Sequence, residues 1–245
     1  ILVLYLKMKP ARVHSWNVSP EEAAAIQISL RPKVKILPYD GPINLLGATS
    51  VAFDTNNDIM HAVVCVVKYP EMSLKEQFGI SQEIRFPYVS GLLAFREGGA
   101  LIQLFHKIEK EPDLLMFHAH GQAHPRGFGL ASHLGVLLDT PSIGISTKLL
   151  IGHHTELDME KGSHTPILYK DRSIGTALRA KEGVNPIYVS VGHKTDLTSS
   201  LRVVKDCITH YRRPEPLRLA QLAVTKQKTG QSIDSIKPSS QTTLF

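Results

Sequence analysis

The chain has 245 residues, a formal net charge of +6 at pH 7 and 42% apolar residues. This apolar content excludes an intrinsically disordered chain, and the length suits one or at most two domains. No apolar run approaches the roughly 18 residues of a membrane helix, so we expect no membrane partner. The mild positive charge permits a nucleic-acid partner without requiring one.

The N-terminus and the cysteines give no sign of secretion. The apolar stretch ILVLYL has only six residues and no basic segment before it, so we do not expect a signal peptide. Cys65 and Cys207 form no metal or redox motif, and we expect both to be buried free thiols in a reducing compartment. The predicted localisation is cytoplasmic.

An irregular arm is expected over residues 1–19, followed by a helix. Ser19 and Glu22 have the spacing of a capping box, in which each side chain binds the backbone N–H of the other residue. The helix should run over 21–31, because Pro32 disfavours its continuation.

The next segments predict a meander of strands. Residues 45–53 and 60–67 are rich in β-forming residues, and the polar cluster 54–58 between them is typical of a hairpin turn. Residues 60–67 are apolar almost throughout, which indicates a central strand covered on both faces. A third strand at 77–84 would extend the meander.

Helices and short strands alternate in the second half. Leu101, Leu104, Phe105 and Ile108 mark one face of a helix that Pro112 would end. The other expected elements are strands at 113–117, 142–145 and 187–191 and helices at 130–138, 197–210 and 216–227. This order predicts an α/β sandwich with a mixed sheet. The polar tail 226–245 is expected to be flexible.

The first candidate site is the segment FPYVSGLLAFRE at 86–97. Pro87 and Gly91 bracket Tyr88, which indicates a loop that presents an aromatic ring, and such rings stack on or wedge between bases. Glu97 follows among apolar residues, where a carboxylate needs a metal ion or an arginine as partner. The alternative is a surface turn and an ion pair between Arg96 and Glu97.

The second candidate is the segment MFHAHGQAHPRGFG at 116–129, with Ser132 and His133 following. It comes directly after a short strand, where α/β sheets place their sites. Its histidines suit either a transition-metal site or a hydrogen-bonded loop. They are His118, His120, His124 and His133.

A third candidate is His193, at the end of the predicted strand in YVSVGHK. A histidine at a strand end can be catalytic or purely structural. Positively charged side chains that would form a basic rim are Arg126, Lys148, Lys194 and Arg202.

Together these segments resemble the endonuclease V family. FPYVSGLLAFRE resembles its wedge loop and following helix, and AHPRGFGLASHLG resembles its signature after the second catalytic strand. PIYVSVGHKTDLTSS and RRPEPLRLA resemble its C-terminal segments. The resemblance runs in register from about His14 to Ala223. It implies a ribonuclease H-like fold, a mixed β-sheet flanked by helices, in a single domain over 1–225.

The resemblance also implies an activity. The family is a group of Mg²⁺- or Mn²⁺-dependent nucleases that recognise inosine or deoxyinosine and cut one phosphodiester bond beyond it on the 3′ side. The expected partner is DNA or RNA that contains inosine, and a monomer is favoured. Glu97 matches the active-site glutamate, Tyr88 the wedge tyrosine and His193 the strand-end histidine. Positions matched to base or nucleic-acid binding are Gly91, Leu93, Ala119, Gly121, Arg126, Leu130 and His133.

Four positions depart from the family pattern. Ser50 and His118 stand where the family has metal-binding aspartates. Ala119 replaces a glycine, and its methyl group would lie near the base. Thr147 occupies the position of the active-site lysine, but Lys148 follows directly and is the candidate for that role.

These departures have a direct chemical meaning. Mg²⁺ prefers carboxylate oxygens, whereas neutral imidazole suits Zn²⁺ or Mn²⁺ better. Glu97 is then the one remaining acid, and we expect the Mg²⁺ site to be weak or absent. Asp54 is a possible substitute, but four residues along a strand place it ~13 Å from Ser50. The other possible set is Glu97, His118 and His120 around Zn²⁺ or Mn²⁺.

Three functions follow from these observations. The first is an endonuclease that acts on inosine-containing nucleic acid. The second is a catalytically weakened or inactive homologue that binds nucleic acid through the wedge and the pocket. The third is a histidine-lined metal hydrolase with another substrate. The retained Tyr88 and Gly91, with the missing acids, favour base binding with little or no cleavage.

Overall fold

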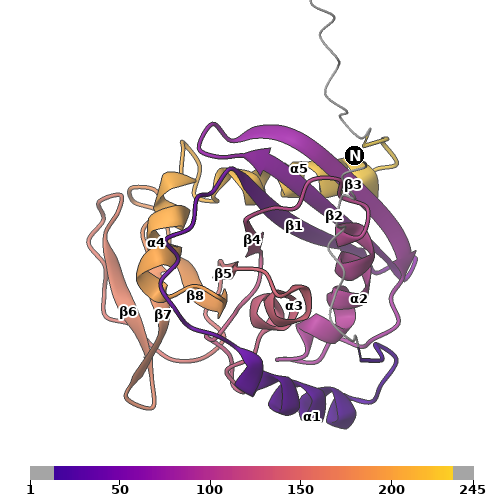
Figure 1. The fold of residues 1–245 in the computed structure, drawn as a ribbon, viewed down its shortest axis with the longest axis horizontal. Helices are drawn as coiled ribbons and strands as arrows, with labels where there is room; N and C mark the ends of the chain where they lie inside the picture. The colour runs from indigo at the N-terminus through magenta and orange to yellow at the C-terminus, as the bar shows by residue number, and fades with distance from the viewer. Residues whose placement is uncertain (1–13, 234–245) are drawn as a thin grey trace, which may run out of the picture.

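A computed structural model of the chain describes residues 14–233, which form one eight-stranded sheet with helices on both faces (Figure 1). The order of the strands is β3-β2-β1-β4-β5-β8-β7-β6. The sheet contains parallel and antiparallel pairs, which confirms the predicted mixed sheet. Most of the expected N-terminal arm and most of the expected tail fall on residues 1–13 and 234–245, outside the described residues.

The elements follow each other in this order. The strands are β1 (Leu45–Asp54), β2 (Ile59–Lys68), β3 (Ser73–Glu83), β4 (Leu114–Phe117), β5 (Ser142–Ser146), β6 (His164–Tyr169), β7 (Arg172–Leu178) and β8 (Ile187–His193). The helices are α1 (Pro20–Leu30), the short η1 (Arg31–Lys33), α2 (Leu93–Phe105), α3 (Leu130–Leu138), α4 (Leu197–Asp206) and α5 (Glu215–Lys228). No helix in the described part of the chain is long and apolar enough to cross a bilayer.

The N-terminal half follows the predicted meander. The capping box of Ser19 and Glu22 is present at the start of α1. β1 pairs antiparallel with β2 across the expected turn, and β2 pairs with β3. Alternate residues of β2 enter two separate cores, so Val64 lies on one face and Val63 on the other. This confirms β2 as a strand covered on both faces.

The two faces of the sheet carry different helices (Figure 1). α1, α2 and α3 contribute to one core, which includes Phe105, Phe117 and Leu134. α4 and α5 contribute to the other core, which includes Val204 and Leu217. The five apolar side chains named here for the two cores are fully or almost fully buried.

Parallel pairing of β1, β4 and β5 determines which side chains share one edge of the sheet. Thr49 on β1 is opposite Phe117 on β4, so Ser50 and His118 follow side by side. Because the carboxyl ends of parallel strands meet at one edge, ligand sites form there in α/β sheets. β8 runs antiparallel to β5, and His193 pairs with Ser142 at the opposite end of that strand.

The structure corrects four boundaries, one of which is the end of α4 at Asp206, four residues before the expected 210. α2 begins at Leu93 and ends at Phe105, with His106 as its C-cap, so Pro112 does not terminate it. β3 begins at Ser73, four residues before the expected start. α5 continues to Lys228, so the first residues assigned to the tail are helical.

The β6–β7 hairpin was missed by the sequence reasoning. Its turn consists of Lys170 and Asp171, which both have positive φ, at 49° and 59°. A two-residue turn with this backbone normally uses asparagine and glycine, and these residues are the usual signal of a hairpin. The signal is absent here because two ordinary residues adopt the left-handed conformation.

Both cysteines are buried free thiols within the core beneath α4 and α5, as expected. Burial raises the pKa of Cys65 to about 12 and raises that of Cys207 further. Neither thiol is reactive at neutral pH, because the thiolate is the reactive form.

Candidate functional site

The loop between β3 and α2 presents Tyr88 to solvent. The side chain of Tyr88 is 77% exposed, the largest exposed fraction among the large apolar side chains of the described residues. Gly91 has φ of +79°, and a Cβ there would lie 2.9 Å from Nη2 of Arg126. The loop therefore needs glycine at this position.

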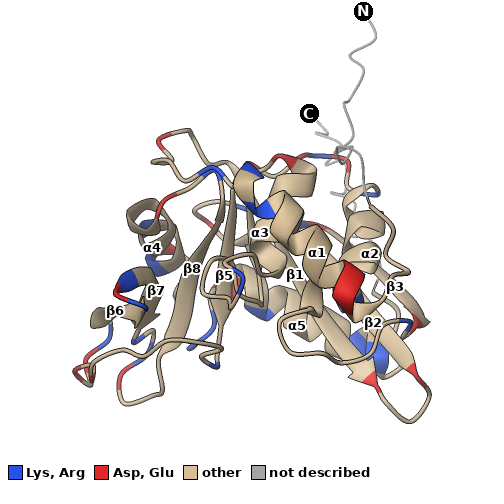
Figure 2. Cartoon of the chain, turned by 90° about the horizontal axis from the view of Figure 1, so that it is seen from below, with Lys and Arg blue, Asp and Glu red and all other residues tan. Residues whose placement is uncertain are grey.

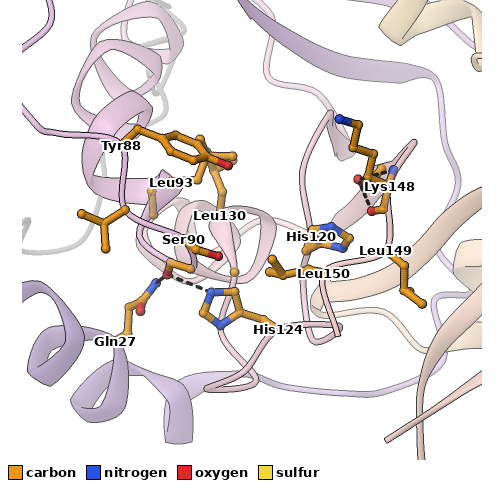
Figure 3. A pocket seen from close by; sticks show the side chains of 15 residues that line it. Gln27, Tyr88, Ser90, Leu93, His120, His124, Leu130, Lys148, Leu149 and Leu150 are labelled. Carbon is orange, nitrogen blue, oxygen red and sulfur yellow. Dashed lines mark hydrogen bonds between the residues drawn. The ribbon is translucent and has the colours of Figure 1, made fainter. Parts of the chain in front are cut away.

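Three side chains hold the carbonyl of Gly91 in place. Nε2 of Gln27 donates to it at 3.1 Å, Nε2 of His124 at 2.8 Å, and Nη2 of Arg126 at 2.8 Å. Figure 3 shows the first two of these hydrogen bonds. Gln27 is itself fixed, because it is buried in α1 and its Oε1 accepts a hydrogen bond from Nε of Arg126. The tyrosine loop is thus anchored to α1 and to the loop after β4.

The hydrogen bonds also define the state of His124. Its Nδ1 accepts from the backbone N–H of Arg126, so Nε2 carries the proton that is donated to Gly91. Burial lowers the pKa of His124 to about 4, partly opposed by the bond to Gly91. The ring is neutral at physiological pH.

A cavity of about 340 Å³ lies beside Tyr88, and we call it the Tyr88 pocket. Five predicted residues line it: Tyr88, Gly91, Leu93, Leu130 and Lys148. Its other lining residues are Gln27, Val89, Ser90, Ala94, His120, His124, Gly129, Ser146, Leu149 and Leu150. Its volume is at the lower end of the range for sites that hold small molecules.

The walls of the Tyr88 pocket combine apolar faces with a polar rim. Figure 3 shows Tyr88, Leu93 and Leu130 on one side and His120 and Lys148 across from them. The rim is ordered by the backbone after β5, where the hydroxyl of Ser146 donates to the carbonyl of Lys148 and accepts from its N–H. Apolar walls with a few polar groups are typical of a site for a small heterocycle.

A second, smaller cavity of about 30 Å³ adjoins this pocket, and we call it the Glu97 cleft. Leu130 lines both cavities. The other residues that line the cleft are Thr49, Ser50, Val51, Glu97 and His118. The structure therefore brings together the three positions at which the sequence suggested metal ligands.

The two titratable groups of the cleft are both neutral near pH 7. Burial raises the pKa of Glu97 to about 8, and the nearby charge of Arg96 opposes this shift. Burial, followed by the charge of Arg213, lowers the pKa of His118 to about 4. The expected ion pair of Glu97 with Arg96 does not form, because Arg96 donates to the carbonyl of Phe86 and lies over the ring of Phe53.

The C-terminal part of the chain adds two residues that the sequence reasoning missed. The hydroxyl of Ser50 donates to Oε1 of Gln221 on α5, at 3.1 Å. Nη1 of Arg213, just before α5, donates to the same oxygen at 3.1 Å. Arg213 belongs to the segment RRPEPLRLA, which resembles the family, and Gln221 follows it directly.

This donor set does not fit Mg²⁺. The cleft offers one carboxyl group, one imidazole and one hydroxyl whose proton is donated to Gln221, and a guanidinium lies close enough to affect His118. Mg²⁺ prefers oxygen ligands, usually one or two carboxylates together with water and substrate phosphates, and the family's two aspartates are absent here. Over residues 14–233, no group of three His, Cys, Asp or Glu side chains is placed to hold a metal ion.

Both substitute metal sets are therefore incomplete. Asp54 is held in the β1–β2 turn, where it accepts from the N–H of Asn56 and the amide of Asn57, and it does not line the cleft. His120 lines the Tyr88 pocket instead of the cleft with Glu97 and His118.

Two predicted histidines lie away from both cavities. His193 is buried at the far end of β8, with Nε2 3.4 Å from Oδ1 of Asp139 and Nδ1 accepting from the N–H of Lys35. His133 is fully buried, and its Nε2 lies 2.7 Å from Nε2 of His14. Phe95 and Phe128 pack against the ring of His133.

The remaining predicted site residues line neither cavity, and they are Ala119, Gly121 and Arg126. Gly121 is packed so closely that a Cβ would lie 2.0 Å from the carbonyl oxygen of Val191. Ala119 is buried, and Arg126 acts through Gly91. The expected basic rim does not form as a unit, because Lys194 pairs with Asp139 and Arg202 donates to the carbonyl of Tyr39.

Comparisons with known proteins agree on one family. The family model described as Endonuclease V matches residues 26–222. An endonuclease V of Dehalococcoides mccartyi is 38% identical over 90% of this chain and 99% of its own length. One of Roseiflexus castenholzii is 40% identical over 87% of this chain and 95% of its own length.

Solved structures show the same arrangement. The endonuclease V of Streptomyces avermitilis superposes with a TM-score of 0.83, at 33% identity, over 88% of this chain and 96% of that one. The endonuclease V of Ciona intestinalis, in complex with a DNA that contains an inosine followed by a ribo-adenosine, superposes with a TM-score of 0.76, at 28% identity, over 86% of this chain and 98% of that one. The ribonuclease H-like α/β fold implied by the sequence is confirmed.

Proposed function

This chain belongs to the endonuclease V family, and from that premise we propose that it binds nucleic acid at inosine or deoxyinosine and holds the deaminated base in the Tyr88 pocket. The observation that carries the proposal is the exposed ring of Tyr88 on an anchored loop beside a cavity of about 340 Å³. The relative from Ciona intestinalis, in complex with inosine-containing DNA, supports it.

Tyr88 has the role of a wedge in this proposal. A base that leaves its stack costs a few kcal/mol of stacking and pairing energy. An aromatic ring that takes its place stacks on the neighbouring base and offsets part of that cost. The three hydrogen bonds to the carbonyl of Gly91 hold the loop in position before the nucleic acid arrives.

The pocket receives the displaced base between apolar walls. Leu93, Leu130 and Leu150 offer apolar contact surface, and polar residues line the same cavity. The carbonyl of Gly91 already accepts three hydrogen bonds, so this carbonyl positions the loop and does not read the base.

Cleavage is expected to be weak or absent. A divalent cation would neutralise the scissile phosphate and activate water, and removal of such a term costs several kcal/mol of transition-state stabilisation. The donor set of the Glu97 cleft does not suit Mg²⁺. The catalytic roles expected for Lys148 and His193 stay predictions, and the distant position of His193 does not support its role.

The second candidate is an active, metal-dependent inosine endonuclease. The observation that favours it is the retention of Glu97 beside Ser50 and His118, at the sheet edge where the matched family has its acids. Cleavage by the protein as it stands would support this candidate over the first.

The test uses purified protein and short DNA and RNA strands with inosine or, as a control, adenosine at one position. We expect binding that depends on inosine, and no cut with Mg²⁺ or Mn²⁺. Equal affinity for both strands would overturn base recognition, and a rapid cut one bond beyond inosine would overturn the inactive site. The double variant Ser50→Asp, His118→Asp should gain Mn²⁺ binding and some cleavage.

Substitution of the wedge gives a matched pair of variants. Tyr88→Ala should weaken binding of the inosine strand by about 5- to 150-fold, because stacking on an aromatic side chain contributes roughly 1–3 kcal/mol per base. Tyr88→Phe keeps the ring and should bind like the parent protein. An alanine variant with unchanged affinity would remove the wedge from the proposal.

A further inference from the structure

We infer that the Glu97 cleft binds a phosphate of the nucleic-acid backbone directly on the guanidinium of Arg213, without a divalent cation. This inference rests on the proposed function, because it assigns the partner of the cleft beside the base pocket. It gives Arg213 a ligand and Gln221 a positioning role, and neither residue has a role in the sequence analysis.

Arg213 lies next to the cleft without lining it, close enough to affect His118, and its positive charge is not paired within the described part of the chain. Arg213 makes no ion pair with any carboxylate within residues 14–233, and its one hydrogen bond to the described residues goes to Gln221. Its neighbours are engaged elsewhere, since Arg212 donates to two carbonyls and Arg218 pairs with Glu215. Among the described residues, Arg213 is thus the arginine of this segment that neither pairs with a carboxylate nor donates to a backbone carbonyl.

The elements that form the cleft contribute few acids. Of the elements that line it, α3 contains none, α2 contains Glu97 alone, and β1 contains only Asp54, which does not line the cleft. Figure 2 shows the acidic residues mainly in turns and at helix ends. A site of this composition attracts an anion, whereas a metal site attracts a cation.

The network on α5 orients the guanidinium. Oε1 of Gln221 accepts from Arg213 and from the hydroxyl of Ser50, which lines the cleft. Gln221 is therefore a positioning residue that ties the arginine to the rim of the cleft. Arginine binds phosphate through charge-assisted and often bidentate hydrogen bonds, so one guanidinium can supply the positive charge that a metal ion supplies elsewhere.

The size and place of the cleft suit this ligand. About 30 Å³ has room for a single oxygen atom, with the rest of the phosphate outside. Leu130 separates the cleft from the Tyr88 pocket, so a phosphate next to a base in that pocket lies at the cleft. Lys148, exposed on the rim of the pocket, adds a second positive charge for the same strand.

The experiment measures the affinity of the full chain for short inosine and adenosine strands in EDTA over a range of salt concentrations. Arg213→Gln should weaken binding of both strands about tenfold and lower the salt dependence by about one phosphate contact. The preference for inosine should remain. Lys226→Gln removes an exposed charge from the same helix and should change neither quantity.

A second variant keeps the test decisive if Arg213→Gln unfolds, which thermal unfolding would reveal. Gln221→Glu has almost the same shape and places a carboxylate beside Arg213, so it should also weaken binding in EDTA. Parental affinity in either folded variant would overturn the inference. So would negligible binding in EDTA that Mg²⁺ restores. Failure of the proposed function looks different, since parental protein would then bind both strands equally while Arg213→Gln still lost affinity.

Discussion

At the scale of the residue, Gly91 shows how much of the site depends on one backbone conformation. Its φ of +79° directs the carbonyl toward three donors from two separate segments. A side chain at this position would add both backbone strain and a close contact with Arg126.

Alanine substitution at two glycines separates the effect of backbone strain from the effect of the position of the tyrosine loop. Gly91→Ala should cost about 1–2 kcal/mol of unfolding free energy from backbone strain alone, and binding of the inosine strand should fall because the tyrosine loop shifts. Gly183→Ala is the control, since Gly183 has φ of +65° with nothing within 4 Å of an added Cβ. Urea denaturation and strand binding measure the two quantities. Equal binding by both variants would contradict a positioning role for Gly91.

The sequence predicted the residues of the site that occur in one contiguous segment. Tyr88, Gly91 and Leu93 belong to a loop with a recognisable pattern, and the structure places all three on the pocket. Gln27 and Gln221 were missed, because a glutamine in a helix gives no local signal of what it will contact after folding. His193 was placed at a strand end correctly, but antiparallel pairing with β5 takes that end away from the site.

At the scale of the element, the hydrophobic pattern of the sequence predicted most strands and helices correctly, whereas turn residues predicted fewer of the turns. β2 was correctly predicted as central because both of its faces are apolar. The β6–β7 hairpin was not found because Lys170 and Asp171 carry no turn signal. The start of α2 at Leu93 has no side-chain cap, which explains why the sequence did not fix that boundary.

The turn between β6 and β7 allows a prediction about stability. Asp171→Gly should raise the free energy of unfolding by about 1 kcal/mol, because glycine adopts a φ near +59° without the cost that a Cβ brings. Asp171→Ala keeps the Cβ and should give no gain. Thermal or urea unfolding of the two variants checks this, and equal stability would show that the turn is not strained.

At the scale of the whole molecule, the order of elements was sufficient to predict the layers. A meander followed by alternating helices and strands led to a mixed sheet with helices on both faces, as found. The relative positions of the segments could not be predicted in the same way. Pairing direction and the side of the sheet on which each helix packs depend on contacts across the entire chain.

Buried histidines couple the stability of the whole fold to pH. Burial lowers the pKa of His118, His120 and His124 to about 4 and that of His133 to about 3. The unfolded chain binds a proton at each near pH 6.5, so stability is complete above that pH and falls as the pH decreases toward the folded values. Glu97 acts in the opposite direction, because its pKa is raised to about 8, but four imidazoles outweigh one carboxyl group.

The fully buried His133 provides the cleanest test. Between pH 6.5 and 5, His133→Gln should reduce the slope of unfolding free energy against pH by up to about 1.4 kcal/mol per pH unit, whatever its effect on stability at pH 7. Urea titrations at several pH values measure the slope of unfolding free energy against pH. A parental slope in His133→Gln would contradict the burial of a neutral imidazole.

The site also draws on both ends of the folded chain. Gln27 from the first helix braces the tyrosine loop, and Gln221 from the last helix reaches the strand that carries Ser50. Under the proposed function, nearly the whole polypeptide must therefore leave the ribosome before the binding site for nucleic acid is complete. A chain that ends before the last helix lacks Gln221, so its site is incomplete and only the full-length protein binds a strand.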